Sequence, residues 1–396
     1  MCVCTQTDLL LSDWERVKLC GHFEQTFAGV RIAESLVWMH STTLGDLYAT
    51  VVAQLRALGQ TVPLELSTDD DEYARSAAVA NGAAEALLFS GQGAQYVGMC
   101  VQLCQESERA RQLFARASEI VGFDVLARCR DGPLPQLSET SVCQIAILVA
   151  DVAALEKVPE AQKRRVKACA GLSLGEYAAL VFADVLTFDD AVRIVHARAQ
   201  AMQAASDAAP TGLASVLGLG DAALQALLDE CNAKAESSQQ LLAVANYLAP
   251  GNRAVGGSSA ALDVLAELAA KHNAKKVTRL NVSGAFHSAH MQPAQAALAA
   301  AVEAAEWRAP RVAVISNVSA RAYESVDEIK AALVRHIVEP VRWQQSIELM
   351  LGDFGVTTFV ELGCGTILTG LLRHILRARN GNGAAPTNVE LCSVSV

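Results

Sequence analysis

The sequence has no excess of positive charge and no long apolar run, and each absence excludes a class of protein. Its 396 residues include 32 Lys and Arg against 42 Asp and Glu, a formal net charge of -10. This balance argues against a nucleic-acid partner, because phosphate binding needs a concentrated excess of basic residues. The apolar stretch at 145–150 ends at Asp151, and no uninterrupted apolar run in the sequence approaches the roughly 20 residues of a membrane span.

The cysteines show no pattern of a disulfide framework or a zinc site. Eleven are scattered along the chain, and only Cys2 and Cys4 lie at a short paired spacing. A chain of this size does not need disulfides to stabilise its fold, so a reducing compartment is favoured. At 52% hydrophobic and 19% charged residues, the chain is too apolar for disorder and can bury a large core. We expect a folded globular protein without a metal.

Residues 1–85 differ from the rest of the chain and look like an extension of unknown role. Apolar residues at helical spacing over 44–58 predict an amphipathic helix before Pro63. An organelle transit peptide should be rich in Arg and Ser and poor in acidic residues, but six acidic residues fall within the first 46. Composition therefore does not support organelle targeting.

From about residue 86, short apolar runs ending in glycine-rich turns alternate with Ala- and Leu-rich helical segments, which indicates an α/β fold. Two strand-helix units at about 208–280 suggest a small inserted subdomain. The Gly-, Asn- and Pro-containing stretch after Arg379 predicts a loosely held tail over 381–396. Expected helices are 144–155, 174–185, 221–233 and 260–271, and expected strands of the small subdomain are 212–217 and 252–255.

The segment 170–177, AGLSLGEY, follows an apolar run and precedes an alanine-rich helix, so it predicts a strand, a sharp turn and a helix. Glycines two residues either side of Ser173 let the backbone take the strained turn that exposes the hydroxyl group. The helix N-terminus then offers backbone N–H groups to an oxyanion. Because Gly-x-Ser-x-Gly also arises by chance, Ser173 is a candidate nucleophile that needs further context.

Two other segments supply that context. Gln92 lies between Gly91 and Gly93 after a short strand, where glycine allows close approach of a ligand, although an ordinary tight turn has the same composition. His287 follows the small residues Ser283, Gly284 and Ala285 and could serve as a general base, although a lone histidine is more often structural. Neither segment decides the question alone.

Five motifs occur in one order along the chain: GQGAQ at 91–95, GLSLGEY at 171–177, Arg198 with Met202 and Gln203, GAFHS at 284–288 and ELGCG at 361–365. Together they resemble the malonyl-CoA:acyl carrier protein transacylases, most of all their plant and algal branch. The resemblance covers about residues 86–378. It implies a hydrolase-like large subdomain with a short parallel sheet at 86–207 and 281–380, split by a small ferredoxin-like α+β subdomain at 208–280.

The resemblance implies a ping-pong acyl transfer. Ser173 would attack the thioester of malonyl-CoA, His287 would take its proton, and the backbone N–H groups of Leu174 and Gln92 would hold the oxyanion. The malonyl group would then pass to the phosphopantetheine thiol of an acyl carrier protein. Serine, base and oxyanion donors suffice for this chemistry, so no metal or bound cofactor is expected.

Substrate selection is expected to rest on Arg198, which matches a family arginine. Its guanidinium could bind the free malonyl carboxylate in two parallel hydrogen bonds, which a neutral acetyl group cannot return. From the residues alone, Arg198 could equally be a solvated helix arginine like Arg193. Phe286 resembles the malonyl-selecting version of its motif, and Gln144 and Asn246 match family pocket residues.

The chain departs from the family pattern at several places, including Leu248, which replaces a second polar residue of the bacterial type. Ser90 replaces the usual proline before Gly91, and the loop at 363–366 reads GCGT instead of Gly-Pro-Gly-Lys. His336 stands where many members have a glutamine whose main-chain carbonyl orients the catalytic histidine. A carbonyl does that work for any side chain, but a second imidazole could shift the pH profile.

Two other functions remain open. A serine hydrolase or thioesterase of the α/β-hydrolase class shares Gly-x-Ser-x-Gly, but it needs an acid between serine and histidine and has no evident use for Arg198. A catalytically silent scaffold that only binds carrier protein would not need Ser173, His287, Gln92 and Arg198 together.

The expected partners are malonyl-CoA and an acyl carrier protein, and docking of the carrier depends on surface charge. Carrier proteins are acidic like this chain, so docking requires a local basic patch. We expect a monomer. The branch resemblance suggests a plastid or mitochondrion, although the start of the chain does not look like a transit peptide. The candidate clusters are Lys163, Arg164, Arg165 and Lys167; Lys275, Lys276 and Arg279; and Arg373, Arg377 and Arg379.

Overall fold

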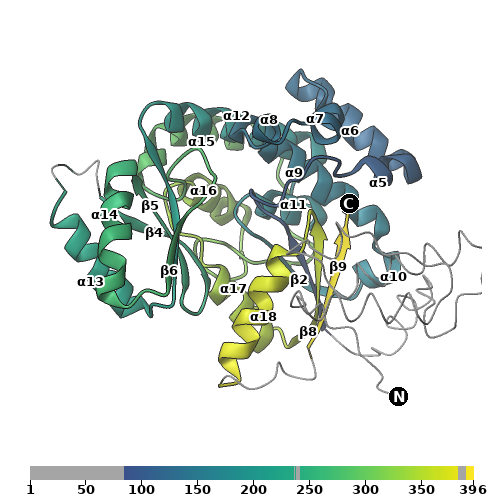
Figure 1. The fold of residues 1–396 in the computed structure, drawn as a ribbon. Helices are drawn as coiled ribbons and strands as arrows, with labels where there is room; N and C mark the ends of the chain where they lie inside the picture. The colour runs from purple at the N-terminus through teal and green to yellow at the C-terminus, as the bar shows by residue number, and fades with distance from the viewer. Residues whose placement is uncertain (1–83, 236, 238–240, 382–388) are drawn as a thin grey trace, which may run out of the picture. The chain divides into compact units, whose positions relative to one another are not determined.

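The computed structural model describes residues 84–235, 237, 241–381 and 389–396, and its strands form two separate sheets (Figure 1). The larger sheet has five strands, all parallel, in the order β7-β2-β1-β8-β9. Its strands are β1 (Ala84–Phe89), β2 (Val166–Gly171), β7 (Ala313–Val314), β8 (Val356–Gly363) and β9 (Glu390–Ser395).

The large sheet is covered on both faces, which explains its nearly continuous apolar strands. In β1, Leu87 and Phe89 point into one core while Ala86 and Leu88 point into the other. The carboxyl ends of parallel strands lie at one edge of a sheet, so the loops after β1, β2 and β8 meet there. That edge is where the predicted site segments leave the strands.

Helix α9 (Thr140–Ala154) is buried along almost its whole length because it packs against β8, α6, α11 and α12. The opposite face of the sheet is covered by α17 and α18, which contribute Trp343, Ile347 and Leu372 to the second core. Besides α9, the helices described in the large subdomain are α5 (Val101–Glu106), α6 (Glu108–Val121), α7 (Val125–Asp131), α8 (Leu134–Leu137), η2 (Leu155–Lys157), α10 (Glu160–Lys163), α11 (Gly175–Phe182), α12 (Phe188–Asp207), η5 (Ala289–Ala294), α15 (Gln295–Ala304), α16 (Val326–His336), α17 (Trp343–Gly352) and α18 (Ile367–Arg379).

The inserted segment forms the second sheet, antiparallel and ordered β4-β5-β3-β6, with α13 and α14 on one face (Figure 1). This β-α-β-β-α-β arrangement confirms the predicted ferredoxin-like subdomain. Its core includes Leu224, Leu228, Leu262 and Leu265 from the two helices. Its elements are β3 (Thr211–Leu217), α13 (Asp221–Asn232), β4 (Ala243–Ala249), β5 (Asn252–Ser258), α14 (Ser259–Ala269), η4 (Ala270–His272) and β6 (Lys276–Arg279).

The prediction of a loose tail over 381–396 is wrong for its last part. Glu390–Ser395 forms β9, which pairs in parallel with β8 and adds an edge strand to the large sheet. The Gly, Asn and Pro residues that suggested a loose tail precede this strand. The strand itself buries Val394 against the main core.

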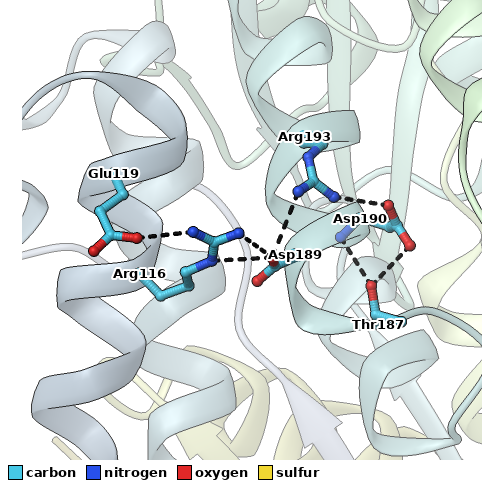
Figure 2. A network of polar contacts seen from close by, with 6 residues as sticks. All are labelled: Arg116, Glu119, Thr187, Asp189, Asp190 and Arg193. Carbon is cyan, nitrogen blue, oxygen red and sulfur yellow. Dashed lines mark hydrogen bonds and ion pairs between the residues drawn. The ribbon is translucent and has the colours of Figure 1, made fainter.

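A polar network joins α6 to the start of α12, the helix that carries Arg198 (Figure 2). The Thr187 side chain accepts a hydrogen bond from the N–H of Asp190 and caps α12. Arg116 of α6 binds Asp189 with two nitrogens, at 2.6 and 3.0 Å. These contacts fix the direction in which α12 enters the core. Glu119 and Arg193 complete the network.

Several expectations fall on residues 1–83, outside the described ranges: the amphipathic helix at 44–58, the extension before residue 84, and the transit-peptide question. Within the part of the chain that the structure describes, no helix combines the length and hydrophobicity needed to cross a membrane. In the same part, no three His, Cys, Asp or Glu side chains gather as a metal site. The absence of a cofactor stays a prediction.

Candidate active site

Ser173 lies in a strained turn between β2 and α11, with φ of 53°. Both neighbouring glycines are required by close contacts. A Cβ on Gly171 would lie 1.8 Å from the carbonyl carbon of Gly175, and one on Gly175 would lie 2.3 Å from the carbonyl oxygen of Phe89. The Gly-x-Ser-x-Gly pattern therefore forms a nucleophile elbow here rather than a chance match.

His287 is placed to accept the proton of Ser173. The Ser173 Oγ and His287 Nε2 atoms are 2.7 Å apart, and the Nδ1 of His287 lies 2.8 Å from the carbonyl oxygen of His336. Because a carbonyl can only accept, Nδ1 carries the hydrogen and Nε2 is left with the lone pair that receives the serine proton. A main-chain carbonyl thus occupies the place that an acidic side chain holds in a Ser-His-Asp triad.

The environment of His287 favours its neutral form. Burial lowers its pKa well below the usual value near 6.5, and the nearby His336 and Arg198 lower it further. A neutral imidazole is the form that can act as a base. His287 is therefore ready to deprotonate Ser173 throughout the physiological pH range.

Arg198 is a buried cation beside the nucleophile. Its side chain is 1% exposed, its Nη2 donates to Ser173 Oγ at 3.2 Å, and its Nη1 donates to Gln144 Oε1 at 2.5 Å. Burial lowers its pKa, and among the described residues its Nε has no hydrogen-bond partner and no carboxylate lies within ion-pairing distance. A buried charge without a counter-ion is costly, so this guanidinium is suited to an anionic ligand. Arg193, by contrast, is 52% exposed and paired with Asp189 and Asp190.

The predicted oxyanion donors lie on two loops in contact. A Cβ on Gly91 would lie 2.4 Å from the Leu172 carbonyl oxygen, so the loop carrying Gln92 rests on the elbow. Across the described ranges, the main-chain N–H groups of Gln92 and Leu174 donate no internal hydrogen bond. The Gln92 side chain is held by Gln144 at 3.5 Å and by Thr140 at 3.4 Å.

The remaining predicted residues lie at different distances from this chemistry. Phe286 is buried in the main core directly before His287. Asn246 lies on β4 and bridges to Val341, and no hydrogen bond links its side chain to the other site residues described. The structure thus brings together Ser173, His287, Arg198, Gln144, Gln92 and the His336 carbonyl, with Asn246 at the border of the small subdomain.

Sequence reasoning missed Asn317, which clamps the elbow from both sides. Its Oδ1 accepts the N–H of Ser173 at 3.0 Å, and its Nδ2 donates to the Gly171 carbonyl at 2.8 Å. The residue is buried and lies 144 positions from Ser173 in sequence. The short segment Ser316-Asn317-Val318 carries no pattern that would have revealed this contact.

Replacing Asn317 with alanine is expected to slow the reaction of Ser173 with a fluorophosphonate by about 10-fold. The strained turn would lose both hydrogen bonds that hold it, and a small misplacement of a nucleophile costs up to about 100-fold in rate. The rate of covalent labelling, followed by intact mass, measures the effect. Asn232→Ala removes a comparable amide clamp, on Leu242 of the small subdomain, and should label at the normal rate. Equal rates for Asn317→Ala and the unaltered protein would show that the clamp is not needed.

His336 also contributes a buried imidazole to the site. Its ring centroid lies 4.8 Å from that of His287, and its Nδ1 lies 3.1 Å from Glu176 Oε2, close enough for an ion pair but not aligned as a hydrogen bond. Glu176 is fully buried and accepts a hydrogen bond from the Tyr323 hydroxyl at 2.6 Å. The catalytic base therefore has a second imidazole ring packed against it, tilted by 33°.

The variant His336→Gln is expected to move the acid limb of Ser173 labelling to higher pH. His336 lowers the pKa of His287, so its removal lets that pKa rise, and a higher pH is then needed to form the neutral base. The main-chain carbonyl that orients His287 is unchanged. A pH series of labelling rates measures the shift, with His272→Gln as a control, since His272 pairs with Glu230 in the small subdomain. An unmoved limb, or one at lower pH, would contradict this account.

Comparisons with known proteins agree with this site. The model of the family described as "Acyl transferase domain" matches residues 86–387. A malonyl CoA-acyl carrier protein transacylase of Bacillus subtilis is 36% identical over 74% of this chain and 90% of its own length, and a mitochondrial counterpart of Homo sapiens is 37% identical over 74% and 77%. A malonyl-transacylase solved in complex with a type II polyketide synthase acyl-carrier protein has a TM-score of 0.71 at 31% identity, covering 78% of this chain and 96% of that one. The chain therefore belongs to the acyl transferase domain family and, within it, to the malonyl-CoA-acyl carrier protein transacylases.

Proposed function

We propose that this chain transfers malonyl from malonyl-CoA to the phosphopantetheine thiol of an acyl carrier protein, supplying extender units for fatty acid synthesis. The observation that carries the proposal is Arg198, a buried cation with no carboxylate partner among the described residues, 3.2 Å from the nucleophile. A malonyl thioester carries a free carboxylate, separated from its reacting carbonyl carbon by one methylene group, and this carboxylate would supply that partner. An acetyl group would leave the charge unpaired.

In the first half-reaction, Ser173 Oγ attacks the thioester carbonyl carbon while His287 Nε2 takes the hydroxyl proton. The carbonyl oxygen becomes an oxyanion, and the N–H groups of Leu174 and Gln92 are its proposed donors. As the oxyanion collapses, the carbon–sulfur bond breaks and the coenzyme A sulfur receives the proton from His287. The product is a malonyl ester on Ser173.

The second half-reaction runs the same steps in reverse with a new thiol. His287 takes the proton of the phosphopantetheine thiol, whose sulfur attacks the ester carbonyl carbon. The bond between the acyl carbonyl carbon and Ser173 Oγ breaks, and Oγ regains its proton from His287. Ser173 and His287 account for every proton transfer in the two half-reactions, so the steps require no resident metal or cofactor.

The hydrolase alternative is less well supported by the site. In that class an acidic side chain orients the histidine, whereas the Nδ1 of His287 faces the main-chain carbonyl of His336. The silent scaffold is opposed by the 2.7 Å contact between Ser173 and His287, which a binding role would not need. The hydrolase alternative predicts release of free malonate, and the silent scaffold predicts no reaction of malonyl-CoA.

Topology narrows the choice among the three basic clusters for carrier-protein docking. Residues 163–167 precede and begin β2, so they lie at the sheet edge opposite Ser173, which follows the end of that strand. Helix α18 links the carboxyl end of β8 to the amino end of the parallel strand β9, so Arg377 and Arg379 also lie toward that far edge. Lys275, Lys276 and Arg279 remain, exposed on the subdomain whose last strand leads to His287.

The double variant Lys275→Glu/Lys276→Glu is expected to raise KM for acyl carrier protein by about threefold to tenfold, because rim charges mainly affect the encounter of acidic and basic surfaces. Formation of malonyl-enzyme from malonyl-CoA should keep its normal rate. Steady-state transfer at varied carrier concentration measures the change. Lys163→Glu/Arg164→Glu, at the opposite edge of the sheet, is the matched control. A larger KM increase in the control would assign docking to the other cluster.

The proposal also covers the location and the oligomeric state of the protein. The family resemblance to a plant and algal branch, and a human relative named as mitochondrial, support a plastid or mitochondrion. Expression of the full chain fused to a fluorescent protein tests this, and a cytosolic signal would overturn it. Light scattering tests the proposed monomer.

The function is tested by mixing the protein with malonyl-CoA and holo acyl carrier protein and following carrier mass. We expect malonyl-carrier protein to form, with little free malonate. Release of free malonate without carrier modification would establish the hydrolase alternative. An unchanged mixture would establish the silent scaffold. Apo carrier protein, which lacks the thiol arm, is the control and should stay unmodified.

A further inference from the structure

A buried carboxyl group holds the residue that leads into the Gln92 loop. Ser90 follows the last residue of β1, and its Oγ donates to Asp151 Oδ1 at 2.7 Å. Asp151 lies near the end of α9, so the contact ties the start of the loop to the central buried helix.

The Asp151 carboxyl group is in an unusual environment for an acidic side chain. It has no exposed surface, and within the described ranges no cation lies at ion-pairing distance from it. Burial raises its pKa well above the ordinary value, and the nearby Glu361 raises it further. Its Oδ2 has no hydrogen-bond partner among the described residues. Burying a carboxyl group with an unpartnered oxygen costs folding free energy, so its presence here calls for an explanation.

The fold leaves space for this carboxyl group at the end of β8. Gly363 has φ of 100°, and a Cβ there would lie 1.8 Å from Asp151 Oδ1 and 2.9 Å from Ser90 Oγ. Any other residue at 363 would collide with the hydrogen bond between Ser90 and Asp151. The ends of β1, α9 and β8 therefore meet around this one contact.

The same contact bears on the proposed oxyanion donors. The Ser90 carbonyl oxygen would lie 2.5 Å from a Cβ on Gly175, so the Ser90 backbone rests directly on the first turn of α11. Gln92 follows two residues later, and Leu174 immediately precedes Gly175. The separation of the Gln92 and Leu174 N–H groups thus depends on where Ser90 sits against the elbow.

We propose that Asp151 is a positioning residue for acyl transfer: through Ser90 it fixes the Gln92 loop against the elbow so that the two oxyanion donors converge. The inference rests on the proposed function, since it takes Gln92 and Leu174 as the donors. Loss of one such donor costs about 100-fold to 1000-fold in rate, and a misplaced donor costs part of that. A carboxyl group that only stabilised the core would instead affect unfolding.

Four variants separate positioning from general stability. Asp151→Ala removes the acceptor, whereas Asp151→Asn keeps an acceptor oxygen of the same shape. Ser90→Pro/Asp151→Ala removes the carboxyl group together with the Ser90 hydroxyl that donates to it, because proline has no side-chain donor. Ser118→Ala, which loses a hydrogen bond to Phe114 on α6, controls for a structural defect away from the loop. Each is measured for kcat and KM with malonyl-CoA, for the Ser173 labelling rate with a fluorophosphonate, and for Tm.

We expect Asp151→Ala to lower kcat and the labelling rate by about 10-fold or more, with KM for malonyl-CoA changed less than about twofold. Asp151→Asn and the double variant should recover most of that loss, since positions in direct contact couple. Normal rates in Asp151→Ala, a loss in Tm alone as in Ser118→Ala, or a double variant no better than Asp151→Ala would overturn the inference. If Asp151→Ala does not fold, the labelling rates of Asp151→Asn and of the double variant test the inference. Slow labelling in both of these variants would contradict the positioning role of Asp151.

The phosphonate keeps this test distinct from that of the proposed function. Its phosphoryl oxygen occupies an oxyanion site whatever acyl group the protein uses. If the unaltered protein fails to accept malonyl but labels readily, the malonyl assignment is wrong while the comparison of labelling rates still judges Asp151.

Discussion

Replacing His287 with alanine is expected to lower kcat for malonyl transfer by about 1000-fold, within the range for loss of a general base. Nε2 of His287 is 2.7 Å from Ser173 Oγ and is kept as the acceptor by the His336 carbonyl. Without it, the serine proton has no acceptor in the attack and coenzyme A has no proton donor on leaving. Rapid-quench measurement of coenzyme A release gives the rate.

The variant His287→Ala also leaves a space that small bases could fill. Added imidazole should restore part of the lost rate, because the His336 carbonyl remains to orient it. His272→Ala, which changes a half-buried histidine paired with Glu230 away from the site, should keep full activity. A loss of less than about 10-fold in His287→Ala would mean that another group serves as the base.

Replacing Arg198 with glutamine is expected to reduce kcat/KM for malonyl-CoA by about 100-fold to 1000-fold, the range for removing one partner of a buried charge pair. The expected effect on acetyl-CoA is much smaller, because acetyl has no carboxylate and gains nothing from the guanidinium. The ratio of the two kcat/KM values should therefore fall sharply. Competition between the two thioesters, read as acyl-carrier masses, measures it.

The control for Arg198→Gln lies on the same helix. Arg193→Gln changes an exposed arginine that belongs to the surface network of Figure 2, and it should leave the preference for malonyl unchanged. If Arg198→Gln instead weakened both thioesters equally, Arg198 would act on Ser173 Oγ, its present hydrogen-bond partner at 3.2 Å, rather than on the malonyl carboxylate.

Part of the fold and of the site could be predicted from the sequence because it depends on residues close together in the chain. The elbow could be predicted because two glycines near Ser173 are forced by backbone contacts that no Cβ would allow. The alternation of apolar runs and helical segments likewise predicted the α/β sheet, since both faces of its strands are buried. Such features depend on neighbours in the chain and so leave a pattern.

Contacts between distant segments left no such pattern. His287 lies 114 residues from Ser173 and Arg198 lies 25 away, and only the family resemblance suggested that they meet. Asn317 was missed, since nothing near it indicates a clamp on a turn 144 residues earlier. Asp151 marks only the end of an apolar run in the sequence, yet in the fold it sits fully buried against Ser90.

The ends of the chain show a different limit. Composition over 381–396 is dominated by Gly, Asn and Pro near its start, and this hid the strand at Glu390–Ser395. An edge strand of six residues gains its stability by pairing with β8, which only the folded sheet provides. Propensity read along the chain cannot detect that partner.

The covalent intermediate can be observed by intact mass after a brief mixing of the purified protein with malonyl-CoA, followed by peptide mapping. We expect one malonyl group per chain, located on Ser173 and lost when holo acyl carrier protein is added. Acetyl-CoA should give little adduct, and Ser173→Ala should give none. A malonyl adduct that persists in Ser173→Ala, or transfer to the carrier without any enzyme-bound malonyl, would contradict the ping-pong mechanism through Ser173.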